Sequence, residues 1–247
     1  MQARFFKPKP YEELFDLTAD PDQITNRIDD PAAAGKAHAF RRALDDHLVA
    51  INDNGFIPEA MAAEGYVTSR SASVYPLKAI MPLASAAARR DRGKTALFLT
   101  ELGNGNAIMR YWAATGFLVL DGPVEAARGP LEAVLRSDPV PQVRIVAAEA
   151  LAKHWNSAEA VRSLGALVEK AEQWQVQLQA LNALTYIGDQ ARLVLPAIEA
   201  ASKIDDEYLS RAGLYLLARL NGIYTPGIKI FDMDQMMRRM AKSGMTG

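Results

Sequence analysis

The sequence contains no cysteine, which excludes disulfide bonds, thiolate nucleophiles, cysteine-ligated zinc and iron–sulfur clusters. It has no apolar run near the roughly 20 residues that a membrane-spanning helix needs. Its formal charge is −1, from 28 basic and 29 acidic residues, so it lacks the basic excess typical of proteins that bind nucleic acid. The first ten residues contain no apolar core of a signal peptide. We therefore expect neither nucleic acid nor a membrane as a partner, and these features alone do not assign a compartment.

What the sequence does contain is an internal repeat, together with 42 alanines, a number typical of closely packed helices. Four apolar segments align, and their second residues are Arg110, Arg144, Gln177 and Arg211. The spacings are 34, 33 and 34 residues. A second apolar pattern precedes each segment and has the same spacings; it begins at Leu97, Leu131, Leu164 and Ile198. Two independent landmarks with one period predict a repeat protein.

Each repeat is predicted to be a pair of helices joined by a turn. The second helix of each pair is built on small residues such as Ala147 and Ala148, which let helices approach to the short end of the roughly 8–10 Å range. Over residues 94–222 the pattern resembles the HEAT-repeat family, an α-solenoid of paired helices. We therefore predict a mainly α fold, with a HEAT-like α-solenoid of about four helix pairs. The alternative is an ordinary helical bundle whose periodicity is accidental.

An acceptor side chain precedes three of the four aligned positions by six residues. The pairs are Asn104 with Arg110, Asp138 with Arg144, and Asp205 with Arg211. In the third repeat both partners are replaced, by Ala171 and Gln177. An acceptor in the turn could bond the guanidinium at the start of the following helix, so stacked repeats would form a structural ladder of charge-assisted hydrogen bonds.

The residues before and after the repeats do not follow the repeat pattern, so we divide the chain after residues 58, 93 and 222. Residues 1–58 contain a predicted strand at Glu12–Leu17 and a helix from about Ala32 to Ile51. One strand and one helix cannot bury a core of their own, so this part should pack on the solenoid, on another chain or on a domain missing from this sequence. Residues 59–93 are a linker with a leading helix over 75–91, which Pro82 should kink or delay. Residues 223–247 should form a methionine-rich capping helix around Asp232–Met240 and a tail.

The segment Leu14-Phe-Asp-Leu-Thr-Ala-Asp-Pro-Asp-Gln-Ile-Thr-Asn26 resembles a stretch near the C-terminus of type I (formylglycine-dependent) sulfatases. In that family it forms the last strand of a small sheet and leads to the last helix. Gln23 and Arg27 depart from the family pattern, which has an acid and an apolar residue there. The helix that follows and the segment Asn54–Glu59 are also similar. A bacterial subset of the family carries a HEAT-repeat tail, which Tyr75–Leu77 and Arg110–Gly116 resemble.

The resemblance implies a C-terminal sulfatase region whose catalytic domain is absent from this sequence. The family's nucleophile is made within Cys/Ser-x-Pro-x-Arg, and the nearest serine here, Ser137, has Pro141 in place of the arginine. We therefore expect no catalytic residue and no cofactor in this chain, because the family's calcium belongs to the missing domain. The expected role is a non-catalytic accessory or scaffold region that packs on a sulfatase catalytic domain or another protein. Such a protein would be secreted or periplasmic.

The other candidate sites are better explained by structural roles than by chemistry. His38, His47 and His154 have no ligand partner at helical spacing, so we expect structural or surface roles. Asp20, Asp22 and Asn26 superficially suggest a calcium loop, but turn and helix-capping roles fit better, because the glycine and distal glutamate of such a loop are missing. Three tryptophans at repeat-related places are expected to pack between helices, with a carbohydrate-stacking surface as the alternative. They are Trp112, Trp155 and Trp174.

Two other functions stay open. A self-standing HEAT-repeat module for protein–protein interaction would use polar residues of the second helices. These candidate partner-surface residues are Glu149, Lys153, Gln179 and Asn182. A repeat-type lyase or other helical enzyme is less favoured, because the sequence shows no convergent group of titratable residues.

Overall fold

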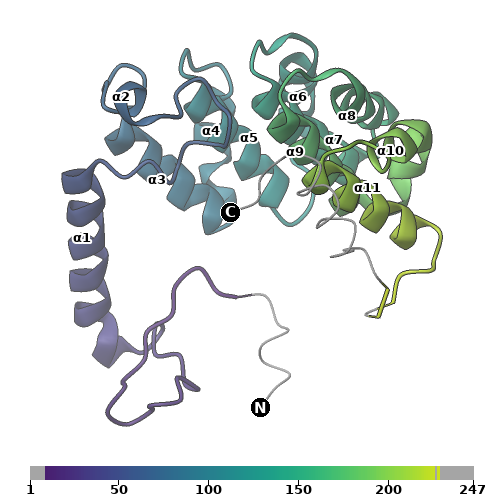
Figure 1. Cartoon of the computed structure of the whole chain (residues 1–247). Coiled ribbons are helices and arrows are strands. Elements are labelled where there is room, and N and C mark those ends of the chain that lie inside the picture. The colour runs from purple at the N-terminus through teal and green to yellow at the C-terminus, as the bar shows by residue number, and fades with distance from the viewer. Residues whose placement is uncertain (1–8, 226, 229–247) are drawn as a thin grey trace, which may run out of the picture.

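The computed structural model describes residues 9–225 and 227–228, and its regular structure over these residues is helical throughout. Eleven α-helices follow one another in these ranges (Figure 1). They are α1 (Ala34–Ile51), α2 (Tyr66–Ser69), α3 (Leu77–Ala88), α4 (Thr95–Glu101), α5 (Ala107–Val119), α6 (Glu125–Ser137), α7 (Pro141–Trp155), α8 (Ala158–Lys170), α9 (Trp174–Ile187), α10 (Leu195–Ala201) and α11 (Glu207–Leu220). Three 3-10 helices, η2 (Pro31–Ala33), η3 (Arg92–Lys94) and η4 (Gly188–Val194), introduce α1, α4 and α10.

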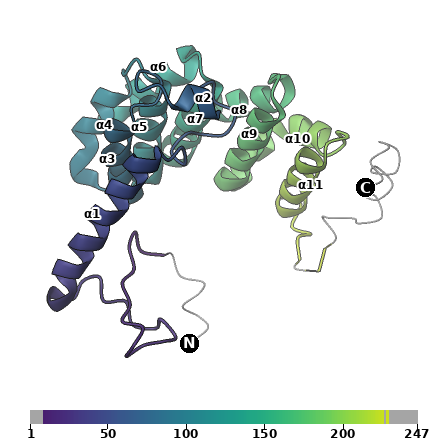
Figure 2. The ribbon, with the colours of Figure 1, turned by 60° about the vertical axis from the view of Figure 1, so that its left-hand side comes forward.

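The predicted solenoid is confirmed. Its four helix pairs are α4 with α5, α6 with α7, α8 with α9, and α10 with α11. The leading helix α3 packs against α5, and the second helices then stack in sequence, α5 against α7, α7 against α9, and α9 against α11. Figures 1 and 2 show this succession from the blue end of the array to the yellow-green end. The leading helix is also present as α3, which covers the open face of α5 and so caps the first pair.

Small side chains set the close approach of these helices. Ala113, Ala147, Ala148 and Ala180 of the second helices are fully buried. Gly213 of α11 shows how tight the contacts are, because a Cβ built there would lie 2.7 Å from the backbone nitrogen of Ser202. Close-packed interiors of this kind do not accept an added carbon without a shift. The alanine-rich second helices therefore form the continuous core of the array.

The predicted strand at Glu12–Leu17 is wrong, since these residues have no regular structure. Their backbone bonds instead to the loop that follows. Leu14 donates its N–H to Oδ1 of Asn26 at 2.9 Å, and its carbonyl accepts the N–H of Arg27 at 2.7 Å. A strand needs a neighbouring strand to pair its backbone groups, and the described residues contain none.

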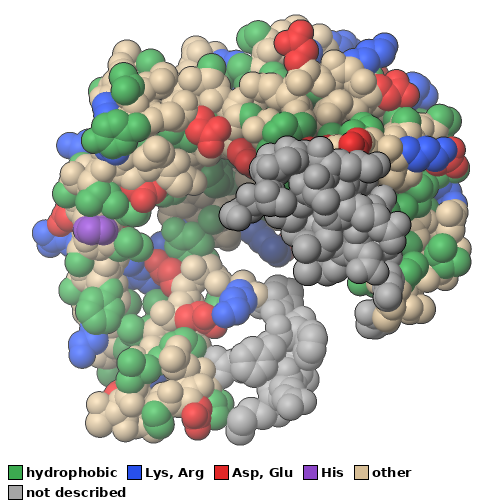
Figure 3. All heavy atoms as spheres, in the orientation of Figure 1, with side chains coloured by type: hydrophobic (Ala, Val, Ile, Leu, Met, Phe, Trp, Pro, Cys, Tyr) green, Lys and Arg blue, Asp and Glu red, His purple; other side chains and the backbone are tan. Residues whose placement is uncertain are grey.

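Residues 9–51, here called the N-terminal arm, precede the repeats and contact the leading helix, where Tyr11 bonds to Ser85 at 2.8 Å and Glu12 pairs with Arg89 at 3.2 Å. The predicted helix from about Ala32 to Ile51 is present as η2 and α1, and α1 extends away from the stacked helices (Figures 1 and 2). Phe40, Leu44 and Ile51 of α1 are 57%, 56% and 47% exposed. An apolar face of α1 is therefore left uncovered by the described residues, and Figure 3 shows hydrophobic side chains on this arm at the lower left.

Two further expectations concern the ends of the helical array. Pro82 lies inside α3, and the helix runs through it from Leu77 to Ala88. The predicted capping helix at Asp232–Met240 falls outside the described residues. Among the described residues no helix is long and apolar enough to cross a membrane.

Candidate functional site

The most buried ion pair among the described residues joins two repeats. Arg110 at the start of α5 donates from Nε to Oδ2 of Asp138 at 2.6 Å and from Nη2 to Oδ1 at 3.0 Å. Its Nη1 also donates to the backbone carbonyl of Asn104 at 2.9 Å. The side chains of Arg110 and Asp138 are only 13% and 3% exposed. The guanidinium thus bonds the turn of its own repeat through the backbone, and the turn of the next repeat through a carboxylate.

The same contact is not made one repeat later. Arg144 makes no hydrogen bond to Asp138, and its Nε is buried without a hydrogen-bond partner within the described part of the chain. By the geometry of Arg110, the acceptor for Arg144 would come from the turn of the third repeat. Ala171 stands there, 33 residues after Asp138. The Asp138–Arg144 pair expected from sequence is therefore replaced by a pair between neighbouring repeats, Arg110 with Asp138. The equivalent pair between the second and third repeats is not formed, because Ala171 has no acceptor side chain.

In the last repeat, Arg211 lies on α11 and donates to Oε1 of Glu207 at 2.9 Å, one helical turn away. Asp205 precedes the helix, and Asp206 accepts the N–H of Leu209 at 2.9 Å and so caps it. Asp206, the residue after the predicted acceptor Asp205, therefore caps α11. It accepts one of the backbone N–H groups that have no partner within the first turn of a helix.

The predicted partner surface is partly covered by the chain itself. Residues 52–76, here called the covering segment, cross the second helices. Gln179 of α9 donates to the carbonyl of Glu59 at 3.1 Å, and Gln142 of α7 donates to the same oxygen at 3.2 Å. Trp112 of α5 donates to the carbonyl of Phe56 at 2.9 Å. No local sequence signal marks these contacts, because they join residues far apart in the chain.

The other partner-surface candidates differ in exposure. Asn182 is exposed on α9. Lys153 donates to the carbonyl of Leu118 at 2.8 Å, so it satisfies an acceptor at the end of α5. Burial raises the pKa of Glu149 to about 7, although the nearby charge of Lys153 opposes this shift. Glu149 is thus a half-buried acid whose charge changes near neutral pH.

Each tryptophan has a partner within the chain. Besides the bond from Trp112, Nε1 of Trp155 donates to Glu125 at 3.0 Å. Trp174 stacks on Tyr208 of the following repeat, with ring centroids 5.4 Å apart. Packing between helices therefore accounts for the positions of these rings.

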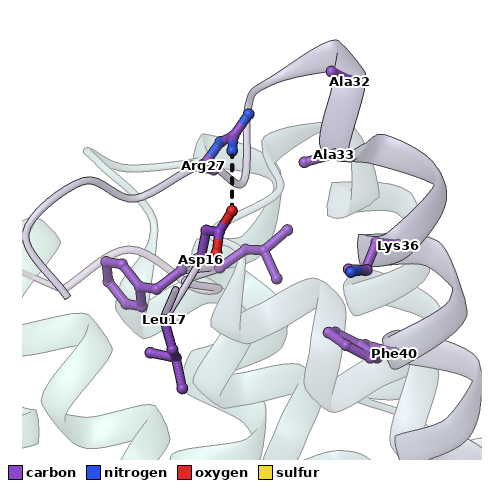
Figure 4. A pocket seen from close by; sticks show the side chains of 9 residues that line it. Asp16, Leu17, Arg27, Ala32, Ala33, Lys36 and Phe40 are labelled. Carbon is purple, nitrogen blue, oxygen red and sulfur yellow. Dashed lines mark ion pairs between the residues drawn. The ribbon is translucent and has the colours of Figure 1, made fainter. Parts of the chain in front are cut away.

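The N-terminal arm contains a pocket of about 330 Å³ between its irregular segment and α1 (Figure 4). Phe40 and Lys36 of α1 line one side, and Leu17 and Asp16 line the other. Arg27 lies 3.8 Å from Asp16 and also pairs with Asp30. The pocket therefore has both polar and apolar walls, with Arg27 paired at one end and Lys36 on the side of α1.

The acidic turn next to this pocket is held by backbone contacts. Asp20 accepts the N–H groups of Ile24 and Thr25 at 3.0 and 2.7 Å, and Asn26 bonds to Leu14. Asp22 lies in the same turn and is exposed. Of the histidines, His154 bonds through Nε2 to the carbonyl of Phe117 at 3.1 Å, and His38 and His47 lie exposed on α1. No cluster of acids and histidines suited to a metal ion occurs within residues 9–225 and 227–228.

The repeat geometry agrees with a comparison against known families, since the model for HEAT repeats matches residues 129–218. The chain contains HEAT repeats. A segment of 60 residues, 24% of the chain, is 38% identical to an ulvan-active sulfatase from Formosa agariphila. The chain spans about a tenth of that relative's length. No solved structure matches the chain. The comparisons therefore support a helical repeat scaffold, together with a short stretch of similarity to a sulfatase.

Proposed function

We propose that this chain is a non-catalytic accessory region of a sulfatase, in which the N-terminal arm packs on a catalytic domain and the HEAT repeats form a scaffold beside it. The observation that carries the proposal is the uncovered apolar face of α1, with Phe40 and Leu44 each more than half exposed. Burying such side chains contributes roughly 1.5–3 kcal/mol each, so a face of this kind favours a covering partner.

The choice of partner rests on the similarity between part of the chain and a sulfatase. In the arm, Leu14–Asn26 carries the resemblance to the sulfatase C-terminal stretch. HEAT repeats support a protein partner in general, because stacked repeats present extended surfaces.

The test is co-purification of the tagged chain with a sulfatase catalytic domain encoded beside it, identified by its Cys/Ser-x-Pro-x-Arg motif. We expect a stable complex, and we expect hydrolysis of 4-nitrophenyl sulfate by the complex but not by the chain alone. The double variant Phe40→Ser/Leu44→Ser should lose the complex. Tyr186→Ser is the matched control, because Tyr186 is 78% exposed on α9 and away from the arm.

Two results would count against the proposal. Turnover of the sulfate ester by the purified chain alone would show that it is catalytic. A chain that is monomeric and folds cooperatively by itself, and that shows no affinity for the catalytic domain, would favour the self-standing interaction module instead.

A further inference from the structure

Arg144 of α7 is the starting point, because its guanidinium Nε is buried without a hydrogen-bond partner in the described part of the chain. Buried polar groups in native proteins are nearly always paired, so an exception of this kind calls for an explanation. Arginine stays charged at any physiological pH, and its planar fork of donors matches the two oxygens of a carboxylate. The position therefore lacks an acceptor.

The preceding repeat shows what that acceptor is. Asp138 follows α6 with φ −65° and ψ 128°, and Ala171 follows α8 with φ −66° and ψ 136°. The N–H of Asp138 donates to Val134 at 3.0 Å, and the N–H of Ala171 donates to Leu167 at 3.1 Å. The backbone conformation at Asp138 and Ala171 is therefore nearly the same, and Arg144 and Ala171 line one cleft. The missing group is the carboxylate itself.

Space for a ligand lies beside the missing group. A cleft of about 650 Å³ between α7, α8 and α9 is lined by Arg144, Lys170 and Ala171. Pro139, Pro141, Leu167 and Val176 supply apolar lining, and Ser163, Ala166, Glu172 and Gln173 complete it. A volume of several hundred cubic ångströms with apolar walls and few charged groups is typical of small-ligand sites. Glu172 is exposed, and no hydrogen bond joins it to Arg144 in the described residues.

We propose that this cleft, the Arg144 cleft, binds an external carboxylate at the part of the Arg144 side chain that lines it. The carboxylate accepts hydrogen bonds from the Arg144 guanidinium, and Lys170 adds a second positive charge. A short apolar body attached to the carboxylate lies against Pro139 and Leu167. The ligand class is an amphipathic carboxylate, either free or at the C-terminus of a peptide. This inference does not depend on the proposed link to a sulfatase.

The test is NMR of the whole chain, in which the Nε–H signal of Arg144 is assigned by its loss in the Arg144→Lys variant. Hexanoate should shift this signal in a saturable way, and uncharged hexanamide should not. The dipeptide Gly-Leu and its C-terminal amide distinguish the two sources. Tighter binding of Gly-Leu than of hexanoate assigns a peptide terminus, and the reverse assigns a free carboxylate.

Two variants separate the site from its surroundings. Ala171→Asp supplies the missing carboxylate from within the chain and should abolish hexanoate binding while the Nε–H signal moves to a bonded position. Arg144→Lys keeps the positive charge but loses the paired N–H donors of the guanidinium. The affinity for hexanoate, measured from the backbone signals of Ala171 and Gln173, should therefore weaken roughly tenfold or more. Glu172→Gln should leave binding intact or strengthen it.

Several outcomes would overturn the inference. These are unchanged hexanoate binding in Ala171→Asp, and binding of hexanamide or sulfate as tight as that of hexanoate. A shift of the Arg144 signal in ligand-free Glu172→Gln would show that Glu172 is already its partner. The absence of any saturable shift with hexanoate and Gly-Leu would also end the proposal.

Discussion

Gln142 of α7 and Gln179 of α9 donate to the same acceptor, the backbone carbonyl oxygen of Glu59, at 3.2 and 3.1 Å. One peptide group of the covering segment therefore links two successive repeats. Gln142 is 2% exposed, so its amide is buried in this contact. The face of the second helices that sequence reasoning assigned to a partner is thus occupied in part by the chain's own backbone.

Replacement of Gln142 by Met should loosen the covering segment. The side chain keeps its size but loses its donor, so we expect a loss of about 1 kcal/mol in the free energy of unfolding. Hydrogen exchange at residues 57–64 should become faster. Asn182→Leu is the control on an exposed position of α9, and it should change neither quantity. Equal exchange rates in the Gln142 variant and the unaltered chain would show that the contact does not hold the segment.

The two arginines at equivalent positions should respond differently to the same change. Arg110→Gln leaves the carboxylate of Asp138 buried without its partner, which is expected to cost roughly 3–5 kcal/mol. Arg144→Gln removes a guanidinium whose Nε has no described acceptor, so its effect should lie within about 1 kcal/mol of zero. Urea unfolding of both variants measures the difference. Equal losses of unfolding free energy in Arg110→Gln and Arg144→Gln would mean that the Arg110–Asp138 ion pair makes no specific contribution to stability.

Glu149 should make stability depend on pH. Its pKa in the folded chain is raised by burial to about 7, above the ordinary value of 4.5. A raised pKa favours the folded state below the unfolded pKa, and this contribution is lost as the pH rises from 4.5 through 7. The loss is roughly 3 kcal/mol across that window. Glu149→Gln should remove this dependence and be more stable than the unaltered chain at pH 8.

The measurement is urea unfolding of both proteins at pH 5 and pH 8. Glu169→Gln is the matched control, because Glu169 is exposed on α8. An unfolding free energy whose pH dependence is identical in the Glu149 variant would show that this carboxyl is not the titrating group.

Gly213 should be intolerant of a side chain. Alanine there places a Cβ 2.7 Å from the backbone nitrogen of Ser202, and the backbone cannot yield as a flexible side chain would. We expect a loss of about 1–3 kcal/mol and a lower Tm for Gly213→Ala. Gly35→Ala in α1 is the control, since no heavy atom lies within 4 Å of its built Cβ. A Tm unchanged by the Gly213 substitution would show that α10 and α11 are less closely packed than described.

The helix pairs could be predicted from sequence because the pattern that marks them is local and repeats. Small residues such as Ala147 and Ala180 recur with the period, and each lies in the core. The strand at Glu12–Leu17 could not be judged this way, because a strand depends on a partner outside the segment. Sequence therefore predicted the repeats well and the arm only at α1.

The polar contacts were less predictable for a related reason. The spacing of Asp138 and Arg144 suggested a bond within one repeat, but the stacking of helices brings Asp138 to Arg110, 28 residues earlier. Contact between repeats depends on the rotation from one unit to the next, which no spacing reveals. The sequence shows that Ala171 replaces the acceptor side chain of the third repeat. That this replacement leaves Nε of Arg144 without a hydrogen-bond partner among the described residues could be seen only in the structure.

The Glu59 carbonyl bridges the joint between α7 and α9, where the arginine–aspartate pairing is interrupted. The covering segment that carries Glu59 follows α1 directly in the chain, and its two ends are joined where Tyr75 donates to the carbonyl of Asp53 at 2.6 Å. The segment that follows α1 is therefore hydrogen-bonded to two successive repeats.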